Sequence, residues 1–464
     1  MHPIELTLKC LPNSQDGVLN VNDNDLNLNM TNSNTKNHVF KLAATLASSH
    51  LFEDYMIYEK DGECWFGGGI ERSVTLYADR LESSYNGQSS VVEVADKTLF
   101  ELLNTELSSW EGAWQANGWA CFELAYALND PSVLNDDEQA GKVPLLFLSQ
   151  PKAIVSLGQQ SPEIQTQDET LKQKINELLN TPKEFNASAN GVSIPDSEEY
   201  KQWVNSSLTE IEKGTLEKVI LSRKLKLDFS PDFVATWLRG RTENTPARSF
   251  SLNLGGWQAS GFSPELVMSV DKNRIVTTEP LAGTRRRDGI LAEDLSRFNE
   301  LYRDPKETHE HAISVYLATN ELKAVCNEPS IVVRQFMERK ERGSVQHLAS
   351  TVCGELKDEL NPWDAFASLF PSVTASGIPK KPAFKEIRRN EVESRGLYAG
   401  AILRISHDGT FDAALVLRSL LGHKGKSWLQ AGAGIVSHST PERELTETTE
   451  KLSSVAPWVM KQMA

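Results

Sequence analysis

The sequence has few cysteines and no long hydrophobic run. Its five cysteines are odd in number and form no CxxC pair, which argues against a disulfide framework and a structural zinc site. No stretch approaches the roughly 18 apolar residues of a membrane span. The N-terminus lacks the basic and apolar regions of a signal peptide. These absences predict a protein of the reducing cytoplasm with no membrane segment.

Positive charge is also scarce, because the formal net charge is −15 and the pI about 5.2. A field of this sign disfavours nucleic acid and anionic membranes as partners. An anionic substrate would have to be attracted by local cations. The sequence contains no Walker loop, no GxGxxG and no HExxH, so nucleotide binding and a zinc hydrolase have little support.

The remaining pattern is that of a folded protein behind an asparagine-rich leader. Residues 1–37 carry too little aliphatic surface to order themselves. From residue 38, short strand-like runs alternate with helical patterns, and residues 157–197 read as a polar connection across the surface. We expect helices over about 198–213, 292–325 and 440–460. Grouped strands separated by long helices predict an α+β fold with mixed α/β layers.

Two of the expected helices each present a pair of glutamates on one face. Glu307 and Glu310 are three residues apart, as are Glu444 and Glu447. If the helices face each other, the four carboxylates repel unless a hard cation such as Mg²⁺ lies between them. The alternative is that both pairs are solvated helix faces. Zinc is disfavoured, because His309 and His311 are spaced by two residues.

Two glycine-rich segments, LAGTRRRDG (281–289) and AGAGI (431–435), follow strand-like runs. Their small residues could bring backbone N–H groups close to an anion, or simply form tight turns. Lys218 opens an otherwise apolar strand, and Glu265 lies between two apolar strands. Burial would shift their pKa values toward a base and an acid, respectively. Otherwise, they are a snorkelling lysine and a surface glutamate.

Together these segments resemble the chorismate-utilising enzymes. The resemblance runs from about residue 195 to the C-terminus, in the order EKVILSR, NTPARSF, GFSPELV, TTEPLAGTR, DPKETHEHAISV, RGSVQHLAST, LFPSVTASGIPK, RGLYAGA, AALVLRS, AGAGIV and PERELTETTEKL. It implies a fold with β-sheets packed inside and helices outside. Residues 38–195 would form the N-terminal part of that fold, and residues 196–464 the chorismate-binding catalytic region.

In detail the motifs are most similar to those of the salicylate synthases. That similarity implies conversion of chorismate to isochorismate and then to salicylate plus pyruvate, with Mg²⁺ as cofactor, for siderophore biosynthesis. An isochorismate synthase that stops at the first product is the nearest alternative. An anthranilate-type synthase and an inactive chorismate-binding protein are further ones. We expect a monomer whose partner is the small molecule chorismate.

The resemblance also assigns roles to individual residues. The catalytic residues would be Lys218 as base, Glu265 as acid, and His347 near the pyruvyl side of the ring. Glu310 and Glu447 would bind Mg²⁺ directly, and Glu307 and Glu444 would hold its waters. The residues that would bind the substrate are Gly283, Thr284, Thr374, Tyr398, Arg418, Gly432 and Lys451. Glu442 and Glu450 are expected to be solvated, and the run Arg285–Arg287 has no assigned role.

Overall fold

The computed structural model describes residues 37–95, 97–185, 191–343 and 345–462. The predicted leader, residues 1–37, lies outside these ranges except for Asn37, where the described part of a helix over 37–47 begins. Within the described ranges, none of the helices combines the length and apolar character that a membrane crossing needs.

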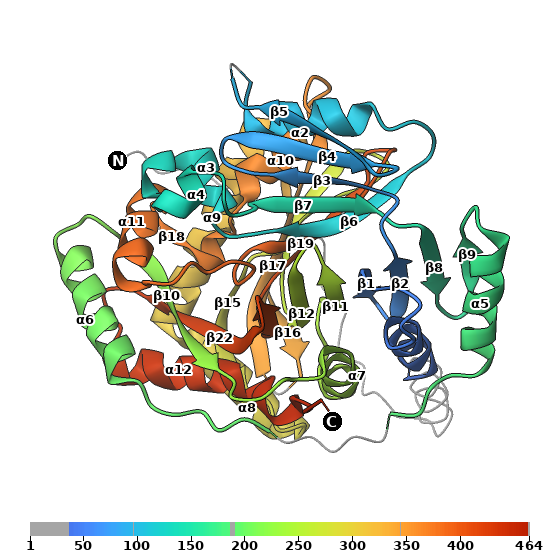
Figure 1. The fold of residues 1–464 in the computed structure, drawn as a ribbon. Coiled ribbons are helices and arrows are strands. Elements are labelled where there is room, and N and C mark those ends of the chain that lie inside the picture. Colours follow the sequence, from blue (N-terminus) through green and yellow to red (C-terminus); the bar gives the residue numbers. More distant parts are fainter. Residues whose placement is uncertain (1–36, 96, 186–190, 344, 463–464) are drawn as a thin grey trace.

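Two large antiparallel sheets lie at the centre of the molecule (Figure 1). The ten-stranded sheet has, in spatial order, the strands β18 (Gly377–Ile378), β10 (Lys218–Lys226), β22 (Lys426–Ile435), β21 (Ser419–His423), β12 (Trp257–Ser263), β11 (Arg248–Leu254), β1 (Tyr55–Lys60), β2 (Glu63–Gly68), β8 (Ala153–Leu157) and β9 (Glu163–Gln165). Strands from both parts of the chain therefore share one sheet, with β1, β2, β8 and β9 of the N-terminal part together at one end.

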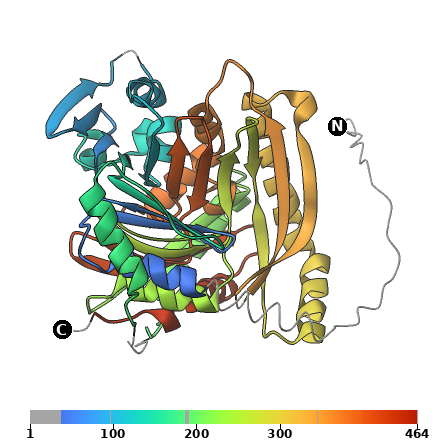
Figure 2. The ribbon, with the colours of Figure 1, turned by 90° about the vertical axis from the view of Figure 1, so that its right-hand side faces the viewer.

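The twelve-stranded sheet is also built from both halves. Its strands, in order, are β15 (Leu281–Arg286), β17 (Val345–Glu355), β14 (Ile275–Thr278), β13 (Leu266–Val270), β20 (Phe411–Leu415), β19 (Ala401–Ser406), β6 (Gln115–Ala120), β7 (Leu146–Gln150), β3 (Arg72–Leu76), β4 (Arg80–Tyr85) and β5 (Gln88–Glu93), with β16 (Val332–Arg342) paired to β17. Figure 2 shows β16 and β17 with the neighbouring helices along one side of the molecule.

Helices surround the sheets, as expected for this fold class. They are α2 (Leu99–Ser108), α3 (Leu124–Asn129), α4 (Asp136–Gln139), α5 (Glu169–Asn180), α6 (Glu198–Glu212), α7 (Phe233–Glu243), α8 (Leu291–Arg303), α9 (Pro305–Val325), α10 (Pro362–Leu369), α11 (Lys380–Asn390) and α12 (Pro441–Ser453), with short 3₁₀ turns η1 (Pro131–Val133), η2 (Glu328–Ser330), η3 (Val373–Ala375) and η4 (Ala456–Trp458). The predicted α+β architecture is confirmed.

The ten-stranded sheet is buried on both faces, and strand β1 shows how. Met56 and Tyr58 belong to the main hydrophobic core, which also contains Leu403 of the other sheet. Ile57, between them in sequence, belongs to a second core formed with helix 37–47 and α7. Because successive side chains of a strand point to opposite faces, one apolar strand serves both cores.

Four local predictions are wrong. The helix expected over 292–325 is two helices, because Asp304 caps α9 and Pro305 opens it. The helix expected to reach residue 460 ends at Ser453 and is followed by η4. The polar connection 157–197 contains β9 and the helix α5. The segment LAGTRRRDG lies largely within strand β15, because its backbone pairs with β17, whereas AGAGI continues the strand-like run before it into β22, which pairs with β10.

Candidate active site

Lys218 is the first residue of β10 and is only 3% exposed. Its backbone pairs with Ile378 of β18, and Val219 beside it pairs with Ile435 of β22. The Lys218 ammonium Nζ lies 2.6 Å from Oε1 of Glu310 on α9. Lys218 is a buried lysine with one carboxylate partner. The alternative interpretation of Lys218 as a snorkelling surface lysine is therefore excluded.

Glu265 occupies the link between β12 of one sheet and β13 of the other. Its carboxyl group is buried, and its Oε1 accepts hydrogen bonds from the hydroxyls of Thr374 at 2.6 Å and Ser372 at 2.9 Å. Burial raises the pKa of Glu265 to about 7, although both hydroxyls and Lys218 favour the charged form. The predicted raised pKa is therefore confirmed, and Glu265 can carry a proton near neutral pH.

The four glutamates of the two helices come together around one lysine. Thr440 caps α12 by accepting from the Arg443 backbone N–H, as its sequence predicts. Lys306 of α9 lies 3.6 Å from Glu444 and 3.9 Å from Glu307. Burial lowers the pKa of Lys306, but the two glutamate pairs outweigh it and raise the pKa overall. The two ExxE pairs thus face each other and are not solvated helix faces.

The individual carboxylates of this glutamate cluster differ in their partners. Glu307 accepts from the Arg443 guanidinium at 2.8 Å, and Glu447 pairs with Lys451 at 2.6 Å. Glu444 is fully buried, and neither of its carboxylate oxygens has a hydrogen-bond partner. Burial and the neighbouring Glu447 raise the pKa of Glu444, whereas Lys451 and Lys306 outweigh the effect of burial and lower that of Glu447.

The donor set fits a hard divalent cation, although the side chains are turned toward basic partners. Among the described residues, no three His, Cys, Asp or Glu side chains are arranged to hold a metal ion. Each carboxylate faces an ammonium or guanidinium group instead. Buried carboxylate oxygens without a partner are costly, however, and a cation bound by oxygen ligands would satisfy them. Glu307, Glu310, Glu444 and Glu447 are therefore the residues that could hold such a cation if their side chains turned away from these basic partners.

His347 of β17 lies at the edge of the glycine-containing strand β15. Its Nδ1 is 2.9 Å from the carbonyl oxygen of Gly283 and 3.2 Å from the hydroxyl of Thr284. Burial and the nearby Arg418 lower the pKa of His347 to about 3, so the ring is neutral. Donation from Nδ1 to the carbonyl leaves Nε2, which is buried without a partner, as an acceptor.

The other predicted substrate-binding residues gather around β22. Lys451 donates to the carbonyl of Gly432 at 2.8 Å. A Cβ atom on Gly432 would lie 2.9 Å from the hydroxyl of Tyr398, so only glycine fits there. Arg418 has one guanidinium nitrogen, Nη1, that is buried without a partner, and burial lowers its pKa to about 10. Arg418 thus remains a cation that can bind an anionic group.

The arginine run of β15 and its following turn pairs with acids. Arg285 lies 3.0 Å from Asp304, Arg286 2.6 Å from Asp288, and Arg287 2.9 Å from Glu341. These pairs leave the run with little free charge to steer a substrate. The expectation that Glu442 and Glu450 of α12 are solvated is confirmed, since both are exposed.

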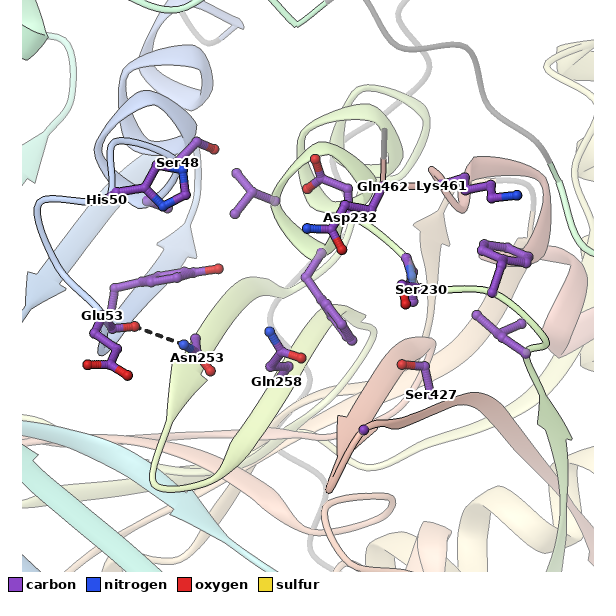
Figure 3. Close-up of a pocket in the computed structure, with 18 of the residues that line it drawn as sticks. Ser48, His50, Glu53, Ser230, Asp232, Asn253, Gln258, Ser427, Lys461 and Gln462 are labelled. Carbon is purple, nitrogen blue, oxygen red and sulfur yellow. Dashed lines mark hydrogen bonds between the residues drawn. The ribbon is translucent and has the colours of Figure 1, made fainter. Parts of the chain in front are cut away.

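A cavity of about 830 Å³ opens beside the base, lined by Lys218, Lys306, His309, Glu310 and His438 among others. A slightly larger cavity, of about 880 Å³, lies elsewhere, between helix 37–47, the start of α7 and the C-terminal residues. Figure 3 shows its polar lining, which includes His50, Asp232 and Lys461. Its lining carries charges of both signs and none of the predicted site residues, so volume alone does not locate the chemistry.

Sequence reasoning missed three residues of this site. Lys306, Ser372 and Arg443 all lie inside motifs that resemble the family, but none was assigned a role. Lys306 and Arg443 directly precede Glu307 and Glu444 in sequence, so their charge beside each ExxE pair was the available signal. Ser372 gave no such signal, because only the fold brings its hydroxyl to Glu265.

With this geometry established, comparison with known proteins defines the class of the protein. The family model described as chorismate binding enzyme matches residues 53–457, so the chain belongs to that family. It is an enzyme of the chorismate-binding family, acting on a small molecule, and the resemblance seen in its motifs is confirmed.

The similarity is specific at the level of sequence as well. The chain is 38% identical over 430 residues to the salicylate synthase of Mycolicibacterium paratuberculosis, which covers 90% of this chain and 93% of that protein. The crystal structure of anthranilate synthase component I from Streptococcus pneumoniae matches with a TM-score of 0.70 and 25% identity, over 85% of this chain and 92% of that one. The menaquinone-specific isochorismate synthase of Escherichia coli shares the fold, with a TM-score of 0.66 and 20% identity over 90% of both chains.

Proposed function

We propose that this enzyme is a Mg²⁺-dependent salicylate synthase, which converts chorismate to isochorismate and then to salicylate and pyruvate. The observation that carries the proposal is that Lys218, from one sheet, pairs with Glu310 of the four-glutamate cluster and lies close enough to Glu265, in the link to the other sheet, for its charge to act on that carboxyl group. The 38% identity to a salicylate synthase over most of both chains supports the two-step reaction.

In the first step, Lys218 takes a proton from a water molecule that attacks C2 of the ring. Glu265 gives its proton to the hydroxyl that leaves C4. Groups placed in this way typically contribute about 10²–10⁴-fold each. The Lys218 Nζ lies 2.6 Å from Glu310, so the proposed base sits directly beside one of the proposed metal ligands.

Chorismate is a dianion, and its two carboxylates need different partners. A bound Mg²⁺ would supply positive charge for one of them, held directly by Glu310 and Glu447 and through water by Glu307 and Glu444. Arg418, Lys451 and backbone amides around Gly432 would hold the other. This arrangement explains how a protein with net charge −15 takes up an anion.

In the second step, pyruvate leaves as a hydrogen moves within the substrate, and the enzyme mainly fixes the substrate conformation. The neutral His347, with Nε2 as a free acceptor, is suited to contact a hydroxyl or carboxyl group without exchanging charge. The salicylate would serve siderophore biosynthesis, as the resemblance implies.

Product analysis tests this proposal directly. The purified chain is incubated with chorismate, with and without Mg²⁺, and the products are separated by chromatography, with salicylate detected by its fluorescence. We expect salicylate and pyruvate only in the presence of Mg²⁺. Isochorismate alone would identify an isochorismate synthase, anthranilate formed with added ammonia an anthranilate-type enzyme, and binding without turnover an inactive relative.

A further inference from the structure

The proposed base and the proposed acid face two different cavities. Lys218 lines the cavity of about 830 Å³, whereas Glu265 lines a separate one of about 20 Å³. The small cavity lies against α9, α10 and η3, and none of the four glutamates of the cluster lines it. The two groups therefore have separate surroundings from which to regain or release a proton after each turnover.

The small cavity has the size and polarity of a site for one water molecule. A water needs at least about 10–15 Å³ of such volume and two to four polar partners. The polar residues that line the cavity are Glu265, Thr278, Ser314, Glu321, Ser372 and Thr374. The hydroxyls of Ser314 and Thr278 already donate to backbone carbonyls, at 2.9 and 2.8 Å, so their oxygens remain available as acceptors. The cavity can thus orient a water by several hydrogen bonds.

A second carboxyl group, that of Glu321, also lines the small cavity. Glu321 of α9 lies 2.6 Å from Lys380 at the start of α11, with side chains 20% and 17% exposed. Burial raises the pKa of Glu321, with Lys380 acting in the opposite sense. Glu321 lies eleven residues beyond Glu310 on the same helix, about 16 Å along its axis, so it belongs to no part of the glutamate cluster.

We propose that one water molecule occupies this cavity and that Glu321, through this water, returns to Glu265 the proton given to the leaving hydroxyl. The relay rests on the proposed function. In each turnover, the C4–O bond breaks and the hydroxyl leaves as water with the Glu265 proton. Glu265 then takes a proton from the cavity water, which takes one from Glu321, and Glu321 regains one from solvent beside Lys380. Lys218 releases its extra proton into the large cavity, so the protons balance.

Glu321 is a positioning residue in the relay, because it acts through Glu265 and does not touch the substrate. Two variants test the relay. Glu321→Gln keeps the shape of the side chain but cannot pass on a proton. Ala318→Val adds two methyl groups at the cavity wall and displaces the water. For both, we expect kcat for chorismate consumption to fall about tenfold with an unchanged KM, less than the 10²–10⁴-fold of the acid itself. The solvent deuterium isotope effect on kcat should rise, since proton return becomes rate-limiting.

The matched controls separate a relay from a structural role. Lys380→Met removes the ion pair but keeps the carboxyl, so kcat should stay within about twofold. Cleavage of supplied isochorismate needs no acid, so all three variants should retain it. Wild-type kcat and isotope effect in both Glu321→Gln and Ala318→Val would overturn the relay alone. A wild type that forms neither isochorismate nor salicylate from chorismate would overturn the proposed function, and the relay with it.

Discussion

The proposed base and the proposed acid have different surroundings. Lys218 is stabilised by the opposite charge of Glu310 and opens on a large cavity. Glu265 is enclosed by two hydroxyls and backed by a cavity that suits one water molecule. The base therefore has a charged partner, whereas burial among uncharged hydroxyls raises the pKa of Glu265 and favours its protonated carboxyl group. The comparison shows that two groups of one site can have different partners and different cavities, because they lie on different structural elements.

One buried arginine connects the two sides. Arg395 is 1% exposed and donates to the Ile220 carbonyl of β10 at 2.6 Å and to the Ala375 carbonyl of η3 at 2.9 Å. It also pairs with Glu391 at 2.6 Å. The strand that carries the base and the turn that carries Thr374 are thus held by the same guanidinium group.

The largest expected effect removes the base. Lys218→Ala should lower chorismate consumption about 10³-fold, since general base catalysis typically contributes about 10²–10⁴-fold. Cleavage of supplied isochorismate should be largely preserved, because that step needs no base. Lys224→Ala, on the same strand but paired with Glu393, is the matched control. Equal loss of both activities in a folded Lys218→Ala variant would contradict the division of labour.

The next prediction breaks the connection between the two sides. Arg395→Met should lower the free energy of unfolding by about 3–5 kcal/mol, because it leaves Glu391 as an unpaired buried charge. Chemical denaturation measures this directly. The double variant Arg395→Met/Glu391→Met should recover part of the stability. If the single variant unfolds at the wild-type denaturant concentration, the arginine does not join the two elements.

The third prediction concerns the proton on Glu265. With a pKa of about 7, Glu265 carries its proton below that pH and loses it above, so chorismate consumption should fall as the pH rises through about 7. Glu265→Gln should lower this rate about 10²-fold and abolish its alkaline decline. Rate measurements between pH 6 and 9 on both substrates check this. A decline that persists in Glu265→Gln would assign the titration to another group.

The smallest expected effect concerns the metal. Glu447→Gln and Glu310→Gln should each weaken Mg²⁺ binding by at least about 10–100-fold, which is the loss typical when a residue that only supports a metal ligand is replaced. Calorimetry without substrate measures this affinity. Glu450 is exposed on the same helix as Glu447, so the control variant Glu450→Gln should leave the Mg²⁺ affinity unchanged. Identical titration curves for all three variants and the wild type would exclude these glutamates as ligands.

Much of this site could be read from local spacing. The ExxE pairs at helical spacing, the Thr440–Pro441 helix start, and the single charges Lys218 and Glu265 among apolar residues are all visible in the sequence. Local spacing failed where partners are distant in sequence. LAGTRR reads as a turn, but it is strand β15 because its neighbour β17 lies some 60–70 positions later in the chain. Ser372 shows no pattern at all until η3 folds against Glu265.

The sequence by itself therefore determined which chemical groups are present, which of them share a helix face, and which family the chain resembles. Only the tertiary structure decided which charges face each other. It placed Lys306 among four carboxylates and paired the arginines of β15 with acidic residues. It also left the carboxylate oxygens of Glu444 and the Nε2 of His347 without hydrogen-bond partners. The physical reason is that burial and pairing depend on neighbours from remote parts of the chain, and these neighbours set the charge state on which the proposed chemistry depends.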